Sequence, residues 1–312
     1  MSEGNRVDQL LEAIHLARAR VYQIGNATPL EPMVIEGVNQ SIWVKREDLG
    51  PIKAYKWRGA FNAMACLTPA QLKGGVVAAS AGNHAQGIAL AARKLGTKAF
   101  IYMPKPTPLV KRKAVMAHGG DSVSIELTGD SFAEAQTAAL EHAAQTGATF
   151  IPPYDSIDVM AGQGTLADEI FTSGEGPFDR VYVAVGGGGM ASAVAALLKS
   201  SWPKVKVIGV EGVDQASMKA AIEMGKPVPL DYVDVFCDGT HKVQLNCTVE
   251  EFDFSGHARR EELLEFAVKA RPKKLLLVHG DPDAASWFEK KLAEALPETE
   301  VIIPQPKAKI TF

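Results

Sequence analysis

Four consecutive glycines at positions 186–189 are the strongest sign of chemistry in the sequence. They follow an apolar run at 181–185 and precede an Ala-rich stretch at 190–198, a pattern that predicts a strand, a turn and a helix. Glycines allow several backbone N–H groups to converge, and the start of a helix adds the positive end of its dipole. A flexible turn is the alternative, but four glycines cost more backbone entropy than a turn needs. The pattern therefore favours a phosphate site.

A second polar turn, at 80–87, has the sequence Ser-Ala-Gly-Asn-His-Ala-Gln-Gly and follows the apolar run 76–79. The first amides of a helix, with Ser80, Asn83 and Gln86 beside them, could bind a carboxylate. Ordinary capping of that helix by Ser80 or Asn83 is the other interpretation, and the sequence leaves both open.

Lys56 lies in an aromatic setting, within the segment Ala-Tyr-Lys-Trp-Arg-Gly-Ala at 54–60. A lone lysine among aromatic residues is usually a solvated side chain that lies along apolar surface. A second charged motif, Lys-Arg-Glu-Asp-Leu, precedes it at 45–49. On its own this setting favours a solvated Lys56, and only the set of motifs changes that interpretation.

The elements that must position these turns alternate along the chain. An amphipathic helix is predicted at 7–21, a strand at 41–45, and further helices at 85–95, 132–145 and 190–198. Short apolar runs predict more strands, at 76–79, 99–103, 122–125, 181–185, 205–210, 275–278 and 301–303. Strands that alternate with helices predict an α/β architecture with parallel sheets. Since no low-complexity linker interrupts the 312 residues, we expect two domains that are intertwined in sequence.

Composition and charge exclude several classes of protein. With 46% hydrophobic and 22% charged residues, the chain is typical of globular proteins. A net charge of -3 leaves no basic surplus for nucleic acid, so we expect no nucleic-acid partner. No signal peptide and no run of 18 apolar residues is present, which predicts a cytoplasmic protein without a membrane span. The three cysteines form no C-x-x-C pair for zinc or redox work.

Taken in order, the motifs resemble those of the pyridoxal phosphate enzymes of the tryptophan synthase β superfamily, called fold type II. Four motifs carry the resemblance: those at 45–49, 55–60 and 80–87, and the tetraglycine turn. Within this superfamily the chain is most similar to serine/threonine dehydratases, over roughly residues 10–239.

The resemblance implies two intertwined three-layer α/β/α domains. A large cofactor-binding domain would consist of 1–42 and 151–312, and a small domain would consist of 43–150. The resemblance also implies pyridoxal 5'-phosphate as cofactor, a small amino acid as substrate and a homodimer as the assembly.

Each motif acquires a role from the resemblance. Lys56 would bind the cofactor covalently, Tyr55 would pack near its ring, and Asn83 would hydrogen-bond its phenolic oxygen. The phosphate would be bound by Gly186, Gly187, Gly188, Gly189 and Met190. The substrate carboxylate would be bound by Ser80, Ala81, Asn83 and His84.

The activity that the resemblance implies is an ammonia-lyase reaction, β-elimination from serine or threonine to give a 2-oxo acid and ammonia. The freed amine of Lys56 would remove the Cα proton. Relatives with racemase activity tend to have a second serine just before the Gly-Asn of the carboxylate loop, where this chain has Ala81. Elimination is therefore favoured, with an amino acid racemase and a catalytically impaired relic with a binding or assembly role as alternatives.

Two departures from the family bear on substrate and metal. The dehydratases usually have Ser-Phe-Lys where this chain has Ala54, Tyr55 and Lys56, so the exact substrate stays open. Some relatives bind a divalent cation through a glutamate matching Glu211 and two downstream oxygens. Here Gln215 and Ser217 stand at those downstream positions, so we expect no tight metal site.

The resemblance to dehydratases ends near residue 239, and their terminal Ser-Gly-Gly-Asn motif is absent. Residues 243–312 instead resemble the RNA-specificity segment of metallo-β-lactamase-type (β-CASP) nucleases, in which histidines matching His257 and His279 serve a zinc centre. Because the H-x-H-x-D-H motif is missing, a structural graft with idle histidines is favoured over an active nuclease.

Element order suggests how this foreign segment could fit. A helix at 260–270, a strand at 275–278 and a turn at 280–282 match the end of a dehydratase, so we expect the strand to complete the edge of the large domain's sheet. That graft would place His279 at the pyridine nitrogen of the cofactor. The alternative is an independent lobe of about 65 residues, which is near the lower limit for a self-sufficient core.

Overall fold

The computed structural model describes residues 3–35, 38–212, 217–225, 248–251, 260–277 and 282–303. The chain divides into two compact units, Met1–Phe252 and Asp253–Phe312.

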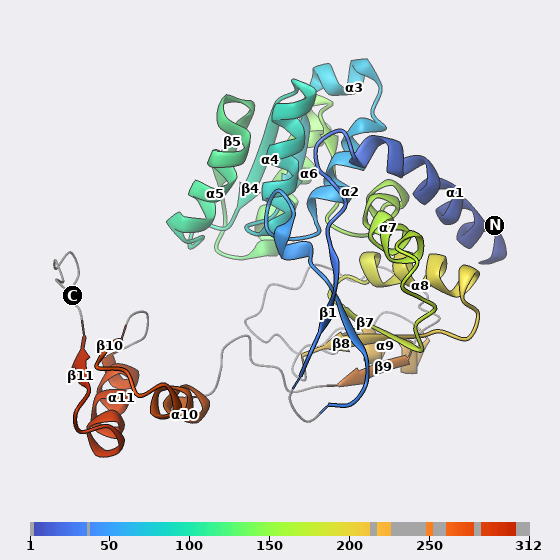
Figure 1. Ribbon diagram of the computed structural model, residues 1–312. Helices are drawn as coiled ribbons and strands as arrows, with labels where there is room; N and C mark the ends of the chain where they lie inside the picture. The colour runs from blue at the N-terminus through green and yellow to red at the C-terminus, as the bar shows by residue number, and fades with distance from the viewer. Residues whose placement is uncertain are drawn as a thin grey trace. The chain divides into compact units, whose positions relative to one another are not determined.

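One parallel sheet of the first unit contains the strands around the polar turn 80–87 (Figure 1). Its order is β5-β4-β3-β6, and every pairing is parallel. The strands are β3 (Val76–Ala79), β4 (Ala99–Met103), β5 (Val123–Leu127) and β6 (Thr149–Phe150). The helices of this region are α3 (Pro69–Gly74), α4 (Asn83–Leu95), α5 (Leu109–Gly119) and α6 (Phe132–Thr146), with a short 3-10 turn, η2 (Gly120–Ser122).

The second sheet of this unit leads into the tetraglycine turn. Its order is β7-β8-β9, again with parallel pairings. The strands are β7 (Arg180–Ala184), β8 (Lys206–Glu211) and β9 (Thr248–Glu251). The helices are α1 (Glu3–Val21), α7 (Ile157–Thr172), α8 (Gly189–Ser201) and α9 (Ser217–Met224).

An antiparallel hairpin and a short helix complete the unit. The hairpin pairs β1 (Leu30–Met33) with β2 (Ile42–Lys45), and the chain then passes through the 3-10 turn η1 (Glu47–Leu49) into α2 (Trp57–Ala65). The mixed α/β architecture with parallel sheets confirms the predicted fold class. The domain boundaries at 42/43 and 150/151 stay predictions.

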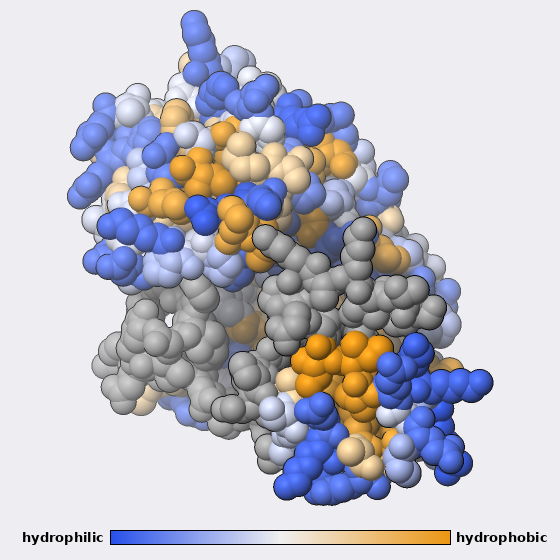
Figure 2. All heavy atoms as spheres, turned by 90° about the vertical axis from the view of Figure 1, so that its left-hand side faces the viewer, coloured by the Kyte–Doolittle hydropathy of each residue, from blue (hydrophilic) through white to orange (hydrophobic). Residues whose placement is uncertain are grey.

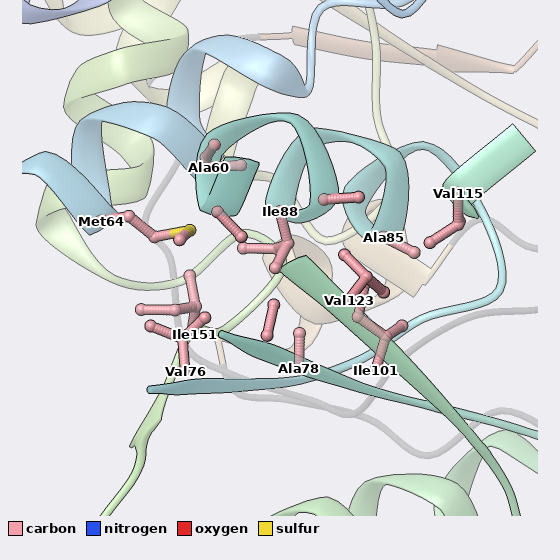
Figure 3. Close-up of a cluster of buried hydrophobic side chains, with 14 of the residues drawn as sticks. Ala60, Met64, Val76, Ala78, Ala85, Ile88, Ile101, Val115, Val123 and Ile151 are labelled. Atoms are coloured by element: carbon pink, nitrogen blue, oxygen red, sulfur yellow. The ribbon is translucent and has the colours of Figure 1, made fainter. Parts of the chain in front are cut away.

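The largest core cluster lies between α2, α4 and the first sheet (Figure 3). Met64, Ile88 and Ile101 are fully buried in it, and Ile151, just past β6, is 3% exposed. Alanines dominate the facing side of α4, which lets the helix approach the strands closely. This packing fixes the start of α4, and with it the polar turn 80–87.

The second unit is a small α/β arrangement. It contains α10 (Arg260–Ala270), β10 (Lys274–Leu276), α11 (Pro282–Ala295) and β11 (Glu300–Ile302). Strand β10 pairs in parallel with β11, in a two-stranded sheet of their own. The prediction that the strand at 275–278 completes the large domain's sheet is therefore wrong. The physical reason is local, since α11 forms the crossover that a parallel pair requires.

Apolar side chains are exposed on both units, as Figure 2 shows for one face. On the first unit, helix α5 exposes Leu109 and Val110, and on the second, α10 exposes Leu263 and Phe266. None of the helices in the described residues combines the length and apolar character that a membrane span requires.

Candidate active site

Lys56 occupies the N-cap position of α2. Its side chain is partly buried, and Nζ donates a hydrogen bond to the carbonyl oxygen of Pro153 at 3.1 Å. Pro153 belongs to the segment 151–154 (Ile-Pro-Pro-Tyr), which joins β6 to α7. The lysine is thus held by a backbone atom of a segment that no sequence motif included.

Arg58, two residues after Lys56, anchors the start of α2. The guanidinium is fully buried and forms two-pronged ion pairs with two carboxylates. It donates to Glu47 twice at 2.9 Å, and to Glu169 at 2.5 and 2.9 Å. Such paired, charge-assisted bonds are the strong ones, because a planar guanidinium matches the geometry of a carboxylate.

Lys45 and Thr28 complete this buried ion network around Arg58. Lys45 Nζ donates to Glu169 at 2.5 Å and to the Thr28 hydroxyl, and that hydroxyl donates to Glu47 at 2.5 Å. Burial works against ionisation of Glu169, yet the bonds and charges of Arg58 and Lys45 hold its pKa below the usual value. The motifs at 45–49 and 55–60 are therefore two parts of one buried ion network.

The polar turn 80–87 lies against Lys56. A Cβ added at Gly87 would lie 3.1 Å from the carbonyl oxygen of Lys56 and 3.2 Å from Trp57 Cα, so α4 and the start of α2 touch through this glycine. Helix α4 has Gly82 as its N-cap and no side-chain cap bond. Capping by Ser80 or Asn83, one of the two interpretations left open above, is thus not what this helix uses.

Ser80 and Asn83 make short-range bonds in this turn. The Ser80 hydroxyl accepts from the Gly82 amide at 3.2 Å, and the exposed Asn83 accepts from Gln86 at 3.4 Å. Ala81 is 6% exposed and packs into the main core cluster. Ala81 therefore contributes a buried methyl group to this turn and no hydroxyl.

His84 is 2% exposed, and its Nε2 lies 3.0 Å from the carbonyl oxygen of Ile151. Because a carbonyl only accepts, Nε2 carries the proton and Nδ1 is an acceptor. Nδ1 is buried without a hydrogen-bond partner in the part of the chain that the structure describes. Burial, and then the charge of Lys56, lower the pKa of His84 to about 3, so the ring is neutral.

The tetraglycine turn joins β7 to the start of α8. Gly188 caps α8 with a φ of 80°, a left-handed conformation suited to glycine. Within the described residues, the amides of Gly186, Gly187 and Gly188 donate to no protein acceptor. A Cβ at Gly187 would lie 2.3 Å from Tyr154 Cγ, and one at Gly189 would lie 2.1 Å from the Tyr154 carbonyl oxygen. The close approach of Tyr154 therefore requires glycine at both positions.

Tyr55 and Met190 come from different motifs and pack against the same apolar cluster, formed by α7, α8 and the second sheet. Burial raises the pKa of Tyr55 to about 12, so its phenol stays neutral. This packing joins the residue before Lys56 to the helix that follows the tetraglycine turn.

Glu211 has a structural role in the described residues. Its carboxylate is buried and accepts from the amides of Met218 and Lys219, both at 3.0 Å, at the start of α9. Gln215 lies outside the described residues, as do His257 and His279. Among the residues that are described, no group of three His, Cys, Asp or Glu side chains could hold a metal ion.

The site fits a ligand with a phosphate and an aldehyde. Amides without protein acceptors at the start of a helix suit phosphate oxygens, and the Lys56 amine is the group that reacts with an aldehyde. These two features, with the polar turn 80–87 beside them, are brought together by the single segment 151–154.

Residues 21–261 match the family model of the pyridoxal-phosphate dependent enzymes, and the chain belongs to this family. The cofactor that the fold and site imply is therefore pyridoxal 5'-phosphate. Residues 242–304 match a second model, that of the Zn-dependent metallo-hydrolase RNA specificity domain.

Individual relatives show which members of the family the chain is similar to. The chain is 46% identical over 231 residues to the biosynthetic L-threonine dehydratase of Haemophilus influenzae, covering 73% of this chain and 44% of that protein. The processed form of threonine deaminase isoform 2 from Solanum lycopersicum has a similar structure, with a TM-score of 0.67, 41% identity, and coverage of 73% of this chain and 62% of that one. Maize serine racemase also has a TM-score of 0.67, with 29% identity and coverage of 72% and 67%. The chain spans about half the length of the curated relatives it matches.

Proposed function

We propose that this protein is a pyridoxal-phosphate-dependent ammonia-lyase that carries out β-elimination on threonine or serine and releases a 2-oxo acid and ammonia. The relatives named threonine dehydratase support the reaction type. The observation that carries the proposal is the assembly of Lys56, the polar turn 80–87 and the tetraglycine turn around the segment 151–154.

The residues of the site divide the work of holding cofactor and substrate. Four glycines, Gly186–Gly189, are followed in α8 by Met190 and offer the amides and the helix start that bind a phosphate. Lys56 supplies the amine that bonds covalently to the cofactor, and Asn83 is assigned to its phenolic oxygen. The cofactor, when bound, supplies an electron sink that makes the Cα proton of an amino acid removable.

Lys56 is also the group that moves the proton. Once the substrate amine has taken its place, Nζ is the base that removes the proton from Cα. The carbonyl of Pro153 orients Nζ through the bond described above. The Ser80 hydroxyl and the amides of Ala81, Asn83 and His84 stand at the start of α4, where a substrate carboxylate is stabilised by the helix dipole.

His84 contributes through its amide and its neutral ring, not through charge. A neutral imidazole whose remaining nitrogen is an acceptor cannot donate to a carboxylate. Its side chain instead ties the carboxylate turn to the segment 151–154.

Elimination and racemisation differ in what must happen at the second face of Cα. Ala81 cannot return a proton there, which favours elimination. Serine racemase is nevertheless among the structural neighbours, so the assay has to measure both products.

Residues 242–304 match an RNA specificity domain. This match favours a second role for the protein, in assembly or in binding. A homodimer and a cytoplasmic location belong to the proposal as well.

The test is an assay of the purified full chain with pyridoxal phosphate and with L-threonine, L-serine and D-serine. The proposal predicts formation of 2-oxo acid and ammonia in equal amounts from at least one L-amino acid. Faster interconversion of L- and D-serine than oxo acid formation would favour a racemase. Cofactor binding without turnover of any hydroxy amino acid would favour the relic with a binding or assembly role.

A further inference from the structure

The segment 151–154 is fixed at both of its ends. Ile151 is buried in the main core cluster (Figure 3). Its amide donates to the Val77 carbonyl at 2.8 Å. Just after the segment, the Ser156 side chain accepts from the Val159 amide at 3.1 Å and caps α7. The backbone between these anchors is held by the core on one side and by a helix on the other.

Residues of this segment contact three different motifs. The Ile151 carbonyl meets His84 Nε2 at 3.0 Å, the Pro153 carbonyl accepts from Lys56 Nζ at 3.1 Å, and Tyr154 lies against Gly187 and Gly189. Two of these contacts use backbone oxygens, so they depend on the path of the chain and not on residue type.

At Gly187 the contact is with the side chain of Tyr154. A Cβ there would lie 2.3 Å from Tyr154 Cγ and 2.4 Å from Cδ1. Cγ is the root of the ring, and Tyr154 is only 9% exposed, so the ring has little room to turn away. The conformation of the turn at Gly187 and the place of the Tyr154 ring are therefore set together.

We propose that the segment 151–154 is a positioning segment that holds Lys56 and the tetraglycine turn at a fixed spacing, with the Tyr154 ring setting the conformation of the turn at Gly187. The inference rests on the proposed function, since the phosphate that this turn receives is that of the cofactor. Tyr154 acts through the turn and is a positioning residue.

The experiment is a double-mutant cycle on the full chain with Gly187→Ala, Tyr154→Ala and the double variant. Pyridoxal phosphate is titrated into each protein to obtain its Kd, and the ³¹P resonance of the bound phosphate is recorded. Gly187→Ala should weaken binding by about tenfold or more and shift the resonance, and the added Tyr154→Ala should recover about tenfold of that loss. Tyr154→Phe keeps the ring and should leave the effect of Gly187→Ala unchanged.

A matched control pairs Tyr154→Ala with Gly74→Ala, because an added Cβ at Gly74 has its nearest neighbour at an ordinary 3.7 Å. These two changes should act independently. If Gly187→Ala alone does not fold, restoration of folding by Tyr154→Ala supports the inference, and failure to restore it contradicts the inference.

The outcomes separate the inference from the proposed function. Wild-type protein that binds pyridoxal phosphate at Lys56, together with additive effects of Gly187→Ala and Tyr154→Ala, overturns the positioning role alone. Wild-type protein that binds no pyridoxal phosphate overturns the proposed function, and the inference with it.

Discussion

Two regions border Lys56, and they treat their polar groups in opposite ways. Around Arg58, the buried ion network pairs a guanidinium and a lysine with two carboxylates and a hydroxyl. Around the tetraglycine turn, the amides of Gly186, Gly187 and Gly188 have no protein partner in the described residues, and Gly188 is buried. A buried polar group without a partner costs free energy, so a fold retains it where a ligand completes the bonds. The first region thus serves stability, and the second serves binding.

The largest effect is expected at Lys56 itself. Lys56→Ala should abolish oxo acid formation, because both the covalent bond to the cofactor and the base for the Cα proton are lost. The free energy of unfolding, measured by urea titration, should change little, since the ion network does not include Lys56. Lys73→Ala at the end of α3 is the control, and equal loss of activity in both variants would contradict the assignment.

At Arg58 we expect the opposite of Lys56, a loss of stability. Arg58→Met leaves Glu47 and Glu169 without their main partner, which should lower the free energy of unfolding by about 3 to 5 kcal/mol. Arg46, whose side chain is 35% exposed and pairs with Glu31 and Asp48, is the matched control, and Arg46→Met should change the free energy of unfolding far less than Arg58→Met. Equal effects of the two changes in urea unfolding would show that burial of the network does not contribute to stability.

Glu169 makes the stability contributed by the ion network depend on pH. Its pKa is lowered in the folded protein from the usual 4.5, so its stabilising effect is complete above that value and is lost as the pH falls through the folded pKa. Glu169→Gln should therefore destabilise the protein at pH 7 and flatten the decline of stability below pH 4.5. The measurement is the free energy of unfolding in urea between about pH 3 and about pH 7, a range that contains ordinary carboxyl titration. An unchanged acid limb in Glu169→Gln would contradict the assignment.

His84 should act in a different pH range, and at pH 7 its effect should be smaller than that of Arg58. Its pKa is lowered to about 3 in the folded protein from 6.5, so the unfolded chain binds the extra proton and stability falls as the pH drops below 6.5. His84→Gln keeps a donor for the Ile151 carbonyl and should remove this slope, which is at most about 1.4 kcal/mol per pH unit. His84→Ala should also cost about 1 to 3 kcal/mol at pH 7, because the carbonyl is left unpaired. Identical unfolding curves for the two variants would exclude the bond as the cause.

The sequence predicted the parts of the site whose chemistry is local. Glycine runs and polar turns after apolar strands are recognisable without a structure, and the strands at 76–79 and 99–103 were correct because they are short and mostly buried. Strand β9 was missed because Thr-Val-Glu-Glu has no apolar run. Strand β1 was missed for a related reason, since it contains Glu31 and Pro32.

Other features depend on contacts that a local pattern does not contain. Arg58 pairs with Glu169, which lies 111 positions away in the chain. The sequence therefore did not reveal that the motif at 55–60 takes part in the ion network. The segment 151–154 was missed because two of its three contacts use backbone oxygens, which carry no sequence signature. The strand at 275–278 was assigned to the wrong sheet because an apolar run shows that a strand is buried and not which strand lies beside it.

The most direct test of the central claim is to map where the cofactor bonds. The full chain is incubated with pyridoxal phosphate, reduced with borohydride, digested and analysed by mass spectrometry. We expect one stoichiometric pyridoxyl adduct on the peptide that contains Lys56, and its loss in Lys56→Ala. An adduct on another lysine, or no adduct at all, would contradict the claim that these turns and this lysine form a pyridoxal phosphate site.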